Sequence, residues 1–390
     1  MKDKHVEKLL KAEEKRQKET INLIASENYV SDDVRAAIGS AFTNKYSEGY
    51  PGKKYYAGQV NADQIELLAQ ERALKLFKLS QKKWHANVQA LAGSAANLAV
   101  YSGLVAPGEK IMGMNLAHGG HLSHGQAVSM TGKIWKQIPY GVDEKTERLD
   151  YAALKEIAMR EKPPLIVAGY TAYPRKIDWK QFRAIADSCG ALLMADISHV
   201  AGLVAGGAYP SPFAYVDVVT TTTHKTLRGP RAAIIFSRID DRGLDKKIDK
   251  AVFPGLQGGP FMHHIAAMAV ALKEADSPAF KKYAAQVVKN AQALAEELQK
   301  CGWRVVSGGT DSHLVLVDVW QKGKGISGSE ASRRLEAVGV ILNKNTIPFD
   351  TRSPFDPSGI RLGTAAETTR GKKEKDFRKI AQIIDSILKK

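Results

Sequence analysis

The chain has 390 residues, 44% of them hydrophobic, and a formal net charge of +16, which predicts an ordinary globular protein with a large core and two domains. Its two cysteines, Cys189 and Cys301, exclude a disulfide framework and lack metal-ligand spacing, so we expect a reducing compartment, by default the cytoplasm. The basic residues are spread along the chain without regular aromatic interleaving, which favours anionic ligands and argues against a specific nucleic-acid partner.

The N-terminal region is predicted to be a helix followed by an extended arm. Residues 1–19 have a charged amphipathic pattern without the apolar core of a signal peptide. Residues 21–34 and 43–58 are irregular arm segments, the second broken at Gly49, Pro51 and Gly52. No apolar run approaches the roughly 20 residues of a membrane span, so we expect no membrane partner.

From about Asp63 the pattern alternates between helices and strands. A helical pattern runs through Leu79. Five apolar strand candidates follow, with helical stretches between most of them, at residues 110–115, 165–170, 191–197, 216–222 and 232–237. Strands separated by helices predict a mainly parallel sheet with helices on both faces, which binds ligands at the carboxyl ends of its strands.

A smaller α+β unit is predicted after this sheet. Residues 265–298 form long helical segments interrupted at Pro278. Three strand candidates follow, at residues 303–308, 313–319 and 339–345, and the closing helix carries an apolar stripe of Phe377, Ile380, Ile384, Ile387 and Leu388. We therefore expect an α/β protein with an N-terminal helix and arm at residues 1–55, a large domain at 56–268 and a small C-terminal domain at 269–390.

The segment VVTTTTHKTLRGPR, residues 218–231, contains a candidate Schiff-base lysine. Its β-branched run predicts a buried strand, and Pro230 predicts a turn, so Lys225 lies at a strand exit beside His224. A lysine becomes a nucleophile near neutral pH when burial or cations such as Arg228 and Arg231 lower its pKa. A solvated loop lysine is the alternative that this segment alone leaves open.

A pyridoxal phosphate enzyme needs such a lysine, an acid opposite the ring nitrogen, a phosphate cradle, and an aromatic or imidazole plane against the ring. Asp196 ends a predicted strand, where its carboxylate suits the ring nitrogen, although a turn or helix-cap role is equally open. In AGSAAN, residues 92–97, Gly93 and Ser94 open an apolar helix and would present backbone N–H groups and a hydroxyl to a phosphate.

Histidines are concentrated in two segments, at His118, His121, His124 and His199. Zinc is the competing interpretation, but no acidic or cysteine partner lies at metal-site spacing, so we expect no metal. Glycines beside His121 would let its imidazole lie flat on a bound ring. Arg361 is the candidate for a substrate carboxylate, which guanidinium binds bidentately, and a surface salt bridge is its alternative.

Taken together, the chain from about Ile21 to Gly371 resembles serine hydroxymethyltransferases, which are fold-type I pyridoxal phosphate enzymes. The matching segments follow the family order: IASENY, TNKYSEGYPGKKYY, GMNLAHGGHLSHG, HVAGLVA, VVTTTTHKTLRGPR, FPGLQGGP, GGTDSHLVLVD, NKNTIPFDTRSPF and SGIRLGT. The resemblance implies the fold-type I architecture, with a mainly parallel central sheet and a smaller α+β C-terminal domain.

The resemblance also implies the cofactor residues. Lys225 would carry the internal aldimine, Asp196 would pair with the pyridine nitrogen, and His121 would stack on the ring. The remaining cofactor residues of the same chain would be Gly93, Ser94, Thr171, His199 and His224. Tyr46, Gly258 and Gly259 would complete the phosphate site from a second subunit, which makes a homodimer the minimal competent unit.

Substrate positions follow from the same resemblance. Ser26, Tyr56 and Arg361 would bind the amino acid. Glu48 would be the proton-transfer carboxylate, with Tyr55 and Tyr56 beside it, reaching across the dimer. The folate pocket would be lined by Glu48, Tyr55, Leu116, Gly120, Leu122, Asn345, Ser353 and Phe355.

The implied reaction converts L-serine and tetrahydrofolate reversibly to glycine and 5,10-methylenetetrahydrofolate. Serine would displace Lys225 to form an external aldimine, and the cofactor ring would stabilise the glycyl carbanion. Where the family commonly has QPHSGSQAN, this chain has QALAGSAAN. Ala92 and Ala95 therefore remove polar groups near the phosphate, and we expect a lower cofactor affinity.

Two rival functions are left open. The first is a folate-independent pyridoxal phosphate aldolase that acts on threonine-like β-hydroxy amino acids. The second is a catalytically dead relative that binds RNA through its positive surface.

Overall fold

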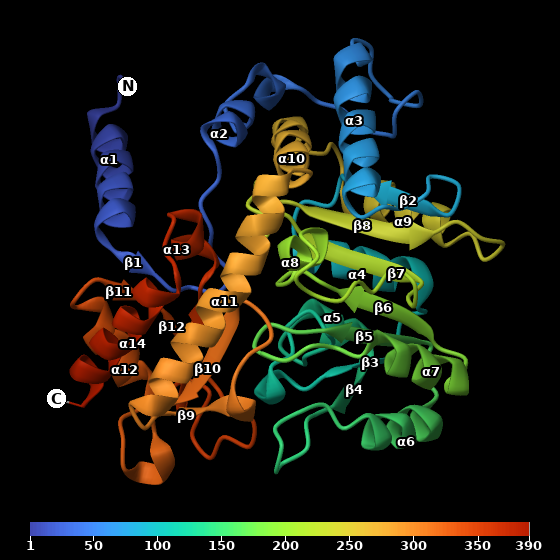
Figure 1. Cartoon of the computed structure of the whole chain (residues 1–390). Helices are drawn as coiled ribbons and strands as arrows, with labels where there is room; N and C mark the ends of the chain where they lie inside the picture. The colour runs from blue at the N-terminus through green and yellow to red at the C-terminus, as the bar shows by residue number, and fades with distance from the viewer. Residues whose placement is uncertain (390) are drawn as a thin grey trace.

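A seven-stranded sheet forms the centre of the larger part of the protein (Figure 1). The computed structural model describes residues 1–389. The strand order is β2-β8-β7-β6-β5-β3-β4; the five strands from β7 to β4 are parallel, and β8 runs antiparallel to both β7 and β2. The strands are β2 (Trp84–Asn87), β3 (Lys110–Met114), β4 (Lys136–Tyr140), β5 (Leu165–Gly169), β6 (Leu192–Asp196), β7 (Val218–Thr222) and β8 (Ala233–Arg238).

The strands β3, β5, β6 and β8 inside this sheet are buried on both faces, which explains why they are almost continuously apolar. Successive side chains point to opposite faces. Leu165 and Val167 of β5 therefore join one core, whereas Ile166 and Ala168 join the other.

The first core is closed by α4 (Gly93–Leu104) and α9 (Leu244–Lys250). The second is closed by α3 (Val60–Leu76), α6 (Tyr151–Glu161), α7 (Trp179–Cys189) and α10 (Met262–Ala275). Shorter elements complete this part: α2 (Asp32–Ile38), α5 (Met130–Ile134), α8 (Ala201–Ala205), η1 (Ala41–Asn44), η2 (Leu116–His118) and η3 (Ala251–Leu256).

A four-stranded antiparallel sheet, ordered β12-β13-β10-β9, forms the smaller part, at the left of Figure 1. Apolar side chains from its strands pack against α11, α12 and α14. Its elements are β9 (Arg304–Val305), β10 (Leu314–Asp318), β12 (Asn343–Asn345), β13 (Gly359–Gly363), α11 (Pro278–Lys300), α12 (Gly328–Glu336), α13 (Ala365–Thr369), α14 (Glu374–Leu388), η4 (Val306–Gly308) and η5 (Gln321–Gly323).

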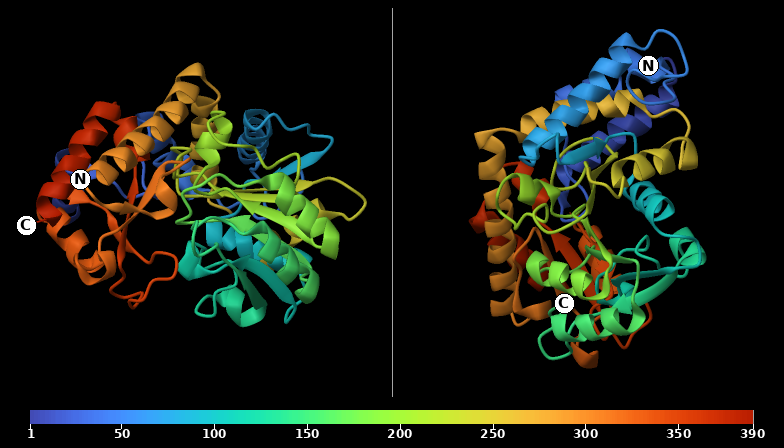
Figure 2. Two further views of the ribbon diagram at one scale, coloured as in Figure 1. Left: turned by 60° about the horizontal axis from the view of Figure 1, so that its bottom comes forward. Right: turned by 90° about the vertical axis from the view of Figure 1, so that its right-hand side faces the viewer.

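The arm is attached to the smaller part, because β1 (Ile21–Asn22) pairs in parallel with β11 (Val340–Ile341). Before it, α1 (Lys4–Glu19) forms as the sequence predicts, yet buries none of its residues. Figure 2 shows the two parts from two further sides. In residues 1–389, no helix combines the length and the apolar character that crossing a membrane requires.

The five predicted strands of the large sheet are confirmed to within two residues at each end, and the predicted fold class is confirmed. Four strands were not predicted: β1 in the arm, β2 and β4, which lie at the edges of the large sheet, and β13. β4 contains Pro139, which an edge strand tolerates because it lacks one neighbour. In β13, Gly359, Arg361 and Gly363 interrupt the apolar pattern.

The change from one core to the other occurs within α11. Side chains up to Val287 belong to the core of the large sheet, and those from Ala291 onward belong to the core of the small sheet. The predicted limit at residue 268 lies within α10. The three-part division at residues 55 and 268 stays a prediction.

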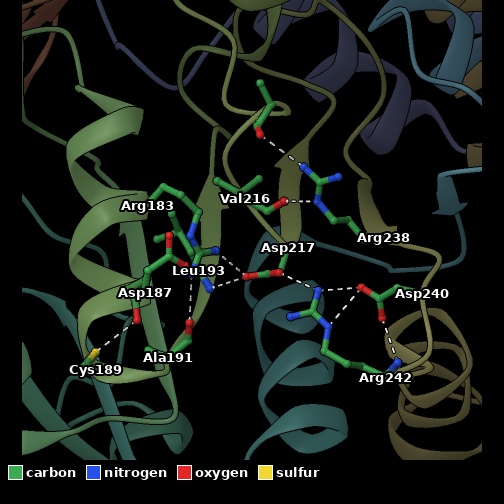
Figure 3. Close-up of polar contacts among 12 residues, drawn as sticks. Arg183, Asp187, Cys189, Ala191, Leu193, Val216, Asp217, Arg238, Asp240 and Arg242 are labelled. Atoms are coloured by element: carbon green, nitrogen blue, oxygen red, sulfur yellow. Dashed lines mark hydrogen bonds and ion pairs between the residues drawn. The ribbon is translucent and has the colours of Figure 1, made fainter.

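At the end of the large sheet where its parallel strands begin, a carboxylate lies between two arginines (Figure 3). Asp217, whose side chain is 8% exposed, accepts hydrogen bonds from Arg183 Nη1 at 2.8 Å, Arg242 Nη2 at 2.7 Å and the Leu193 backbone N–H at 2.8 Å. Burial opposes ionisation of Asp217, but these donors outweigh it and lower its pKa. The carboxylate therefore links β6, α7 and the turn after β8.

We expect Asp217→Ala to lower the free energy of unfolding by about 3 kcal/mol, because it leaves a buried N–H and two cations without their partner. Since the pKa of Asp217 is lower in the folded state, this stabilisation is present above the unfolded-state pKa and is lost as the pH falls. Urea unfolding should therefore show the gap between parent and variant at pH 7 and its decrease below about pH 4.

Asp187→Ala is the matched control, because Asp187 also pairs with Arg183 but its side chain is 66% exposed. It should change the free energy of unfolding by less than about 1 kcal/mol. Equal losses for the two variants would contradict the structural role given to Asp217.

Candidate active site

A cavity of about 280 Å³ opens at the carboxyl ends of β5, β6 and β7. This is where a parallel sheet is expected to bind ligands. The cavity brings together Ser26, Gly93, Ser94, His121, Thr171, Asp196, His199, His224, Lys225 and Arg361, all of which were singled out from the sequence. They come from the arm, from both sheets and from the start of α4.

Lys225 lies in the turn after β7 and is only 9% exposed. Burial, with smaller contributions from the charges of Arg361 and Arg231, lowers its pKa to about 8, against the opposing effect of Asp196. The turn is fixed from the arm, because Asn28 Nδ2 donates to the Lys225 carbonyl at 3.0 Å. With a pKa of about 8, about a fifth of such an amine is neutral at pH 7.4 and can attack a carbonyl carbon.

Asp196 is the last residue of β6, and its side chain is the carboxylate that lines the cavity. Burial opposes its ionisation, but hydrogen bonds from His124 Nε2 at 3.0 Å, Asn97 Nδ2 at 2.9 Å and the Ser198 N–H at 3.0 Å outweigh burial and lower its pKa. An ionised carboxylate in this position suits a protonated ring nitrogen.

The start of α4 forms an anion cradle. Its N-cap residue, Ala92, makes no side-chain hydrogen bond, so the first backbone N–H groups of α4 receive no side-chain cap, and Gly93 and Ser94 line the cavity. A Cβ on Gly93 would lie 2.7 Å from Thr222 Cγ2, so a larger residue would collide with β7. Free N–H groups at the positive end of a helix bind phosphate.

Three imidazoles of the cavity are neutral at pH 7. Burial first, then neighbouring positive charges, lower the pKa of His121 to about 4 and of His224 to about 3, and hold that of His199 far below its ordinary value. Because the Ser123 N–H donates to Nδ1 of His121 at 3.1 Å, that ring carries its proton on Nε2. Neutral rings can stack on a flat ligand without adding charge.

Arg361 comes from β13 of the small sheet and is 7% exposed. Its guanidinium donates to Asn343 Oδ1 at 3.1 Å and to the Thr171 carbonyl at 2.8 Å, and within residues 1–389 it has no carboxylate partner. Burial lowers its pKa to about 10, so it remains charged. A buried cation without a counter-ion indicates an anionic ligand.

The other predicted residues lie outside this cavity. Tyr46 and Tyr56 donate to Glu48 at 3.2 and 3.0 Å, and their rings meet edge to face. Gly258 and Gly259 pack against this cluster, since their Cβ positions would lie 2.9 Å from Glu48 Oε1 and 3.5 Å from the Tyr46 ring. Tyr55 contacts the Phe253 ring edge to face and is 75% exposed.

A buried ion pair fixes the arm that carries this cluster. Lys54 Nζ contacts Glu66 Oε2 at 2.6 Å, both side chains are almost fully buried, and Lys54 also donates to the Gly49 carbonyl at 2.8 Å. Gln89 bridges Glu66 and the same carbonyl. The arm therefore presents Glu48 and the tyrosines at the surface from a rigid base.

Apart from Glu48 and Tyr55, the predicted folate residues lie in two segments that meet between the large and small parts. Leu116, Gly120 and Leu122 belong to residues 116–122, and Asn345, Ser353 and Phe355 belong to residues 345–355. The segments are in contact, because the His118 and Phe349 rings pack with centroids 4.7 Å apart. The first also adjoins the cavity, since the Gly119 carbonyl accepts from the Thr171 N–H.

Three residues that line the cavity were not predicted, Tyr170, Ser198 and Thr222. Asn97 and His124, which donate hydrogen bonds to Asp196 without lining the cavity, were not assigned this role either. His124 belongs to the histidine-rich segment, but its partner lies 72 residues away in the sequence. Within residues 1–389, no group of three or more His, Cys, Asp or Glu side chains is placed to hold a metal ion.

Comparison with known proteins identifies the chain. The family model described as serine hydroxymethyltransferase matches residues 1–384. A serine hydroxymethyltransferase of Koribacter versatilis is 53% identical over 378 residues, which are 97% of this chain and 87% of the relative. One of Leptospira biflexa is 54% identical over 382 residues, which are 98% of this chain and 90% of the relative.

The chain belongs to the serine hydroxymethyltransferase family. It is therefore a pyridoxal-phosphate-dependent enzyme of the fold-type I class that uses tetrahydrofolate as cosubstrate, as the sequence resemblance implied. The cavity fits this cofactor. It offers a buried amine, an ionised carboxylate and free N–H groups at the start of α4, and His224 Nδ1 is buried without a partner.

Proposed function

We propose that this cavity catalyses the reversible transfer of the hydroxymethyl carbon between L-serine and tetrahydrofolate, with Lys225 as the covalent attachment point of pyridoxal phosphate. Arg361 carries this proposal, because it is a buried, charged guanidinium that shares the cavity with Lys225 and lacks an acidic partner within residues 1–389. An amino-acid carboxylate would neutralise it.

The bound cofactor supplies an electron sink for the carbanion that forms when the serine side chain leaves. Asp196 would hold the ring nitrogen protonated, Gly93 and Ser94 would bind the phosphate, and His121 would lie against the ring. Ser26 would bind the substrate carboxylate together with Arg361, and Thr171 and His199 would contact the phenolic oxygen. These roles are supported by the common cavity and by the neutral state of its imidazoles.

Glu48, Tyr55 and Tyr56 would act in the active site of a second copy of the chain, so the functional unit would be a homodimer. They do not line the cavity of their own chain, and the large aromatic side chains of Tyr46, Tyr55 and Tyr56 are 59%, 75% and 47% exposed. An aromatic patch of this kind is typical of an interface. Tyr46, Gly258 and Gly259 would reach the partner's phosphate from the same cluster.

The folate would lie where residues 116–122 meet residues 345–355, next to Thr171. Phe355 is 87% exposed and Leu122 is 47% exposed, so both offer apolar surface to a ring system. The cysteines Cys189 and Cys301 are free, which fits the cytoplasmic location that we propose.

Purified protein loaded with pyridoxal phosphate should transfer the hydroxymethyl carbon of labelled serine to tetrahydrofolate. Lys225→Gln should abolish this transfer, because the attachment point and the neutral amine are lost. The measurement is glycine formation with and without tetrahydrofolate. Glycine formation that is indifferent to tetrahydrofolate would instead favour the folate-independent aldolase.

Mixing two inactive variants tests the shared active site. If Glu48 acts across the dimer, a heterodimer of Lys225→Gln and Glu48→Gln chains contains one intact site. Random reassociation should then restore about a quarter of the parent activity, because half of the dimers are mixed and each has one working site of two. No recovery after verified subunit exchange would place Glu48 in the active site of its own chain.

A further inference from the structure

A second imidazole lies behind His199. His313 Nε2 is 3.2 Å from His199 Nδ1, which is hydrogen-bonding distance, and the two ring centroids lie 5.4 Å apart. His313 directly precedes β10 of the small sheet, whereas His199 follows β6 of the large sheet. Both side chains are buried, so the pair joins the two parts of the protein beside the cavity.

The same nitrogen of His313 has another partner. His313 Nε2 lies 3.1 Å from the carbonyl oxygen of Ala25, which is buried and receives no other hydrogen bond from residues 1–389. A carbonyl oxygen can only accept a hydrogen bond. His313 Nε2 therefore carries a hydrogen.

Neither ring holds a second proton at neutral pH. Burial lowers the pKa of His313 to about 3, with smaller contributions from the charges of Arg361 and Lys225, and the same causes hold the pKa of His199 far below its ordinary value. A neutral imidazole has one N–H group. The Nδ1 of His313 is then a lone pair, which agrees with its being buried without a hydrogen-bond partner.

The hydrogen on His313 Nε2 is shared between the Ala25 carbonyl and His199 Nδ1. His199 Nδ1 must therefore accept, and the single proton of His199 resides on Nε2. His199 lines the cavity, and Nε2 is the ring nitrogen that remains to contact a ligand there.

We propose that His313 is a positioning residue that fixes the Nε2–H tautomer of His199, so that His199 is a hydrogen-bond donor to an acceptor oxygen in the cavity. The tautomer follows from contacts within this chain. Naming the acceptor as the phenolic oxygen of pyridoxal phosphate rests on the proposed function. The Ala25 contact extends the same chain of hydrogen bonds to the residue before Ser26, so one imidazole sets both the donor state of His199 and the position of the arm.

The tautomers are measured directly by ¹⁵N NMR of histidine-labelled protein, with and without pyridoxal phosphate. We expect His313 and His199 each to show a protonated Nε2 and an unprotonated Nδ1. The His199 signals are assigned by their loss in His199→Gln. A protonated Nδ1 on His199 in the folded parent protein would overturn the proposal. This test requires no variant of His313.

A pair of variants separates tautomer control from packing. His313→Gln keeps an amide that can donate both to Ala25 and to His199, whereas His313→Met has a similar length and no donor. The His199 tautomer should be retained in the first variant and lost in the second. The visible absorption band of bound pyridoxal phosphate should titrate about one pH unit higher in His313→Met, because a donor to a charged oxygen is lost.

The NMR measurement tests the role of His313, and the enzyme assay tests the proposed function separately. If the tautomers are as expected but serine and tetrahydrofolate do not react, the reaction assignment is wrong and the role of His313 stands. If His313→Gln and His313→Met give the same His199 tautomer and the same absorption profile, His313 acts only by packing and the proposal is wrong.

Discussion

The site depends on an imbalance of buried charge. Two cationic side chains, Lys225 and Arg361, are buried in one cavity, and Asp196 is the acidic residue among the side chains that line it. Asp196 is itself held by His124, Asn97 and the Ser198 N–H. The uncompensated positive charge, together with the uncapped start of α4, makes the cavity complementary to a ligand with a phosphate and a carboxylate. Pyridoxal phosphate joined to an amino acid is such a ligand.

The topology of the sheet creates this arrangement. Five parallel strands bring their carboxyl ends to one edge, so Thr171, Asp196 and Lys225, which are far apart in the sequence, surround one cavity. At the amino ends of these strands, Asp217 links β6, α7 and the turn after β8. The small sheet then contributes Arg361 of β13 to the cavity and places His313, which precedes β10, behind His199.

The sequence predicts much of this because strand exits are visible in a linear pattern. A β-branched run before a turn located Lys225, and an apolar run ending in a carboxylate located Asp196. Long-range partners leave no such pattern. Asp196 and His124 are 72 residues apart, and His199 and His313 are 114 residues apart, so only the fold brings each pair together. Arg361 was singled out for its chemistry, but its strand was missed because glycines interrupt the apolar alternation in β13.

We expect the buried amine of Lys225 to bind the cofactor covalently. This attachment can be measured by borohydride reduction of the protein loaded with pyridoxal phosphate, followed by peptide mass mapping. One pyridoxyl group per chain is expected, on the peptide that contains Lys225. A label on another lysine, or one scattered over the many lysines of the surface, would contradict it.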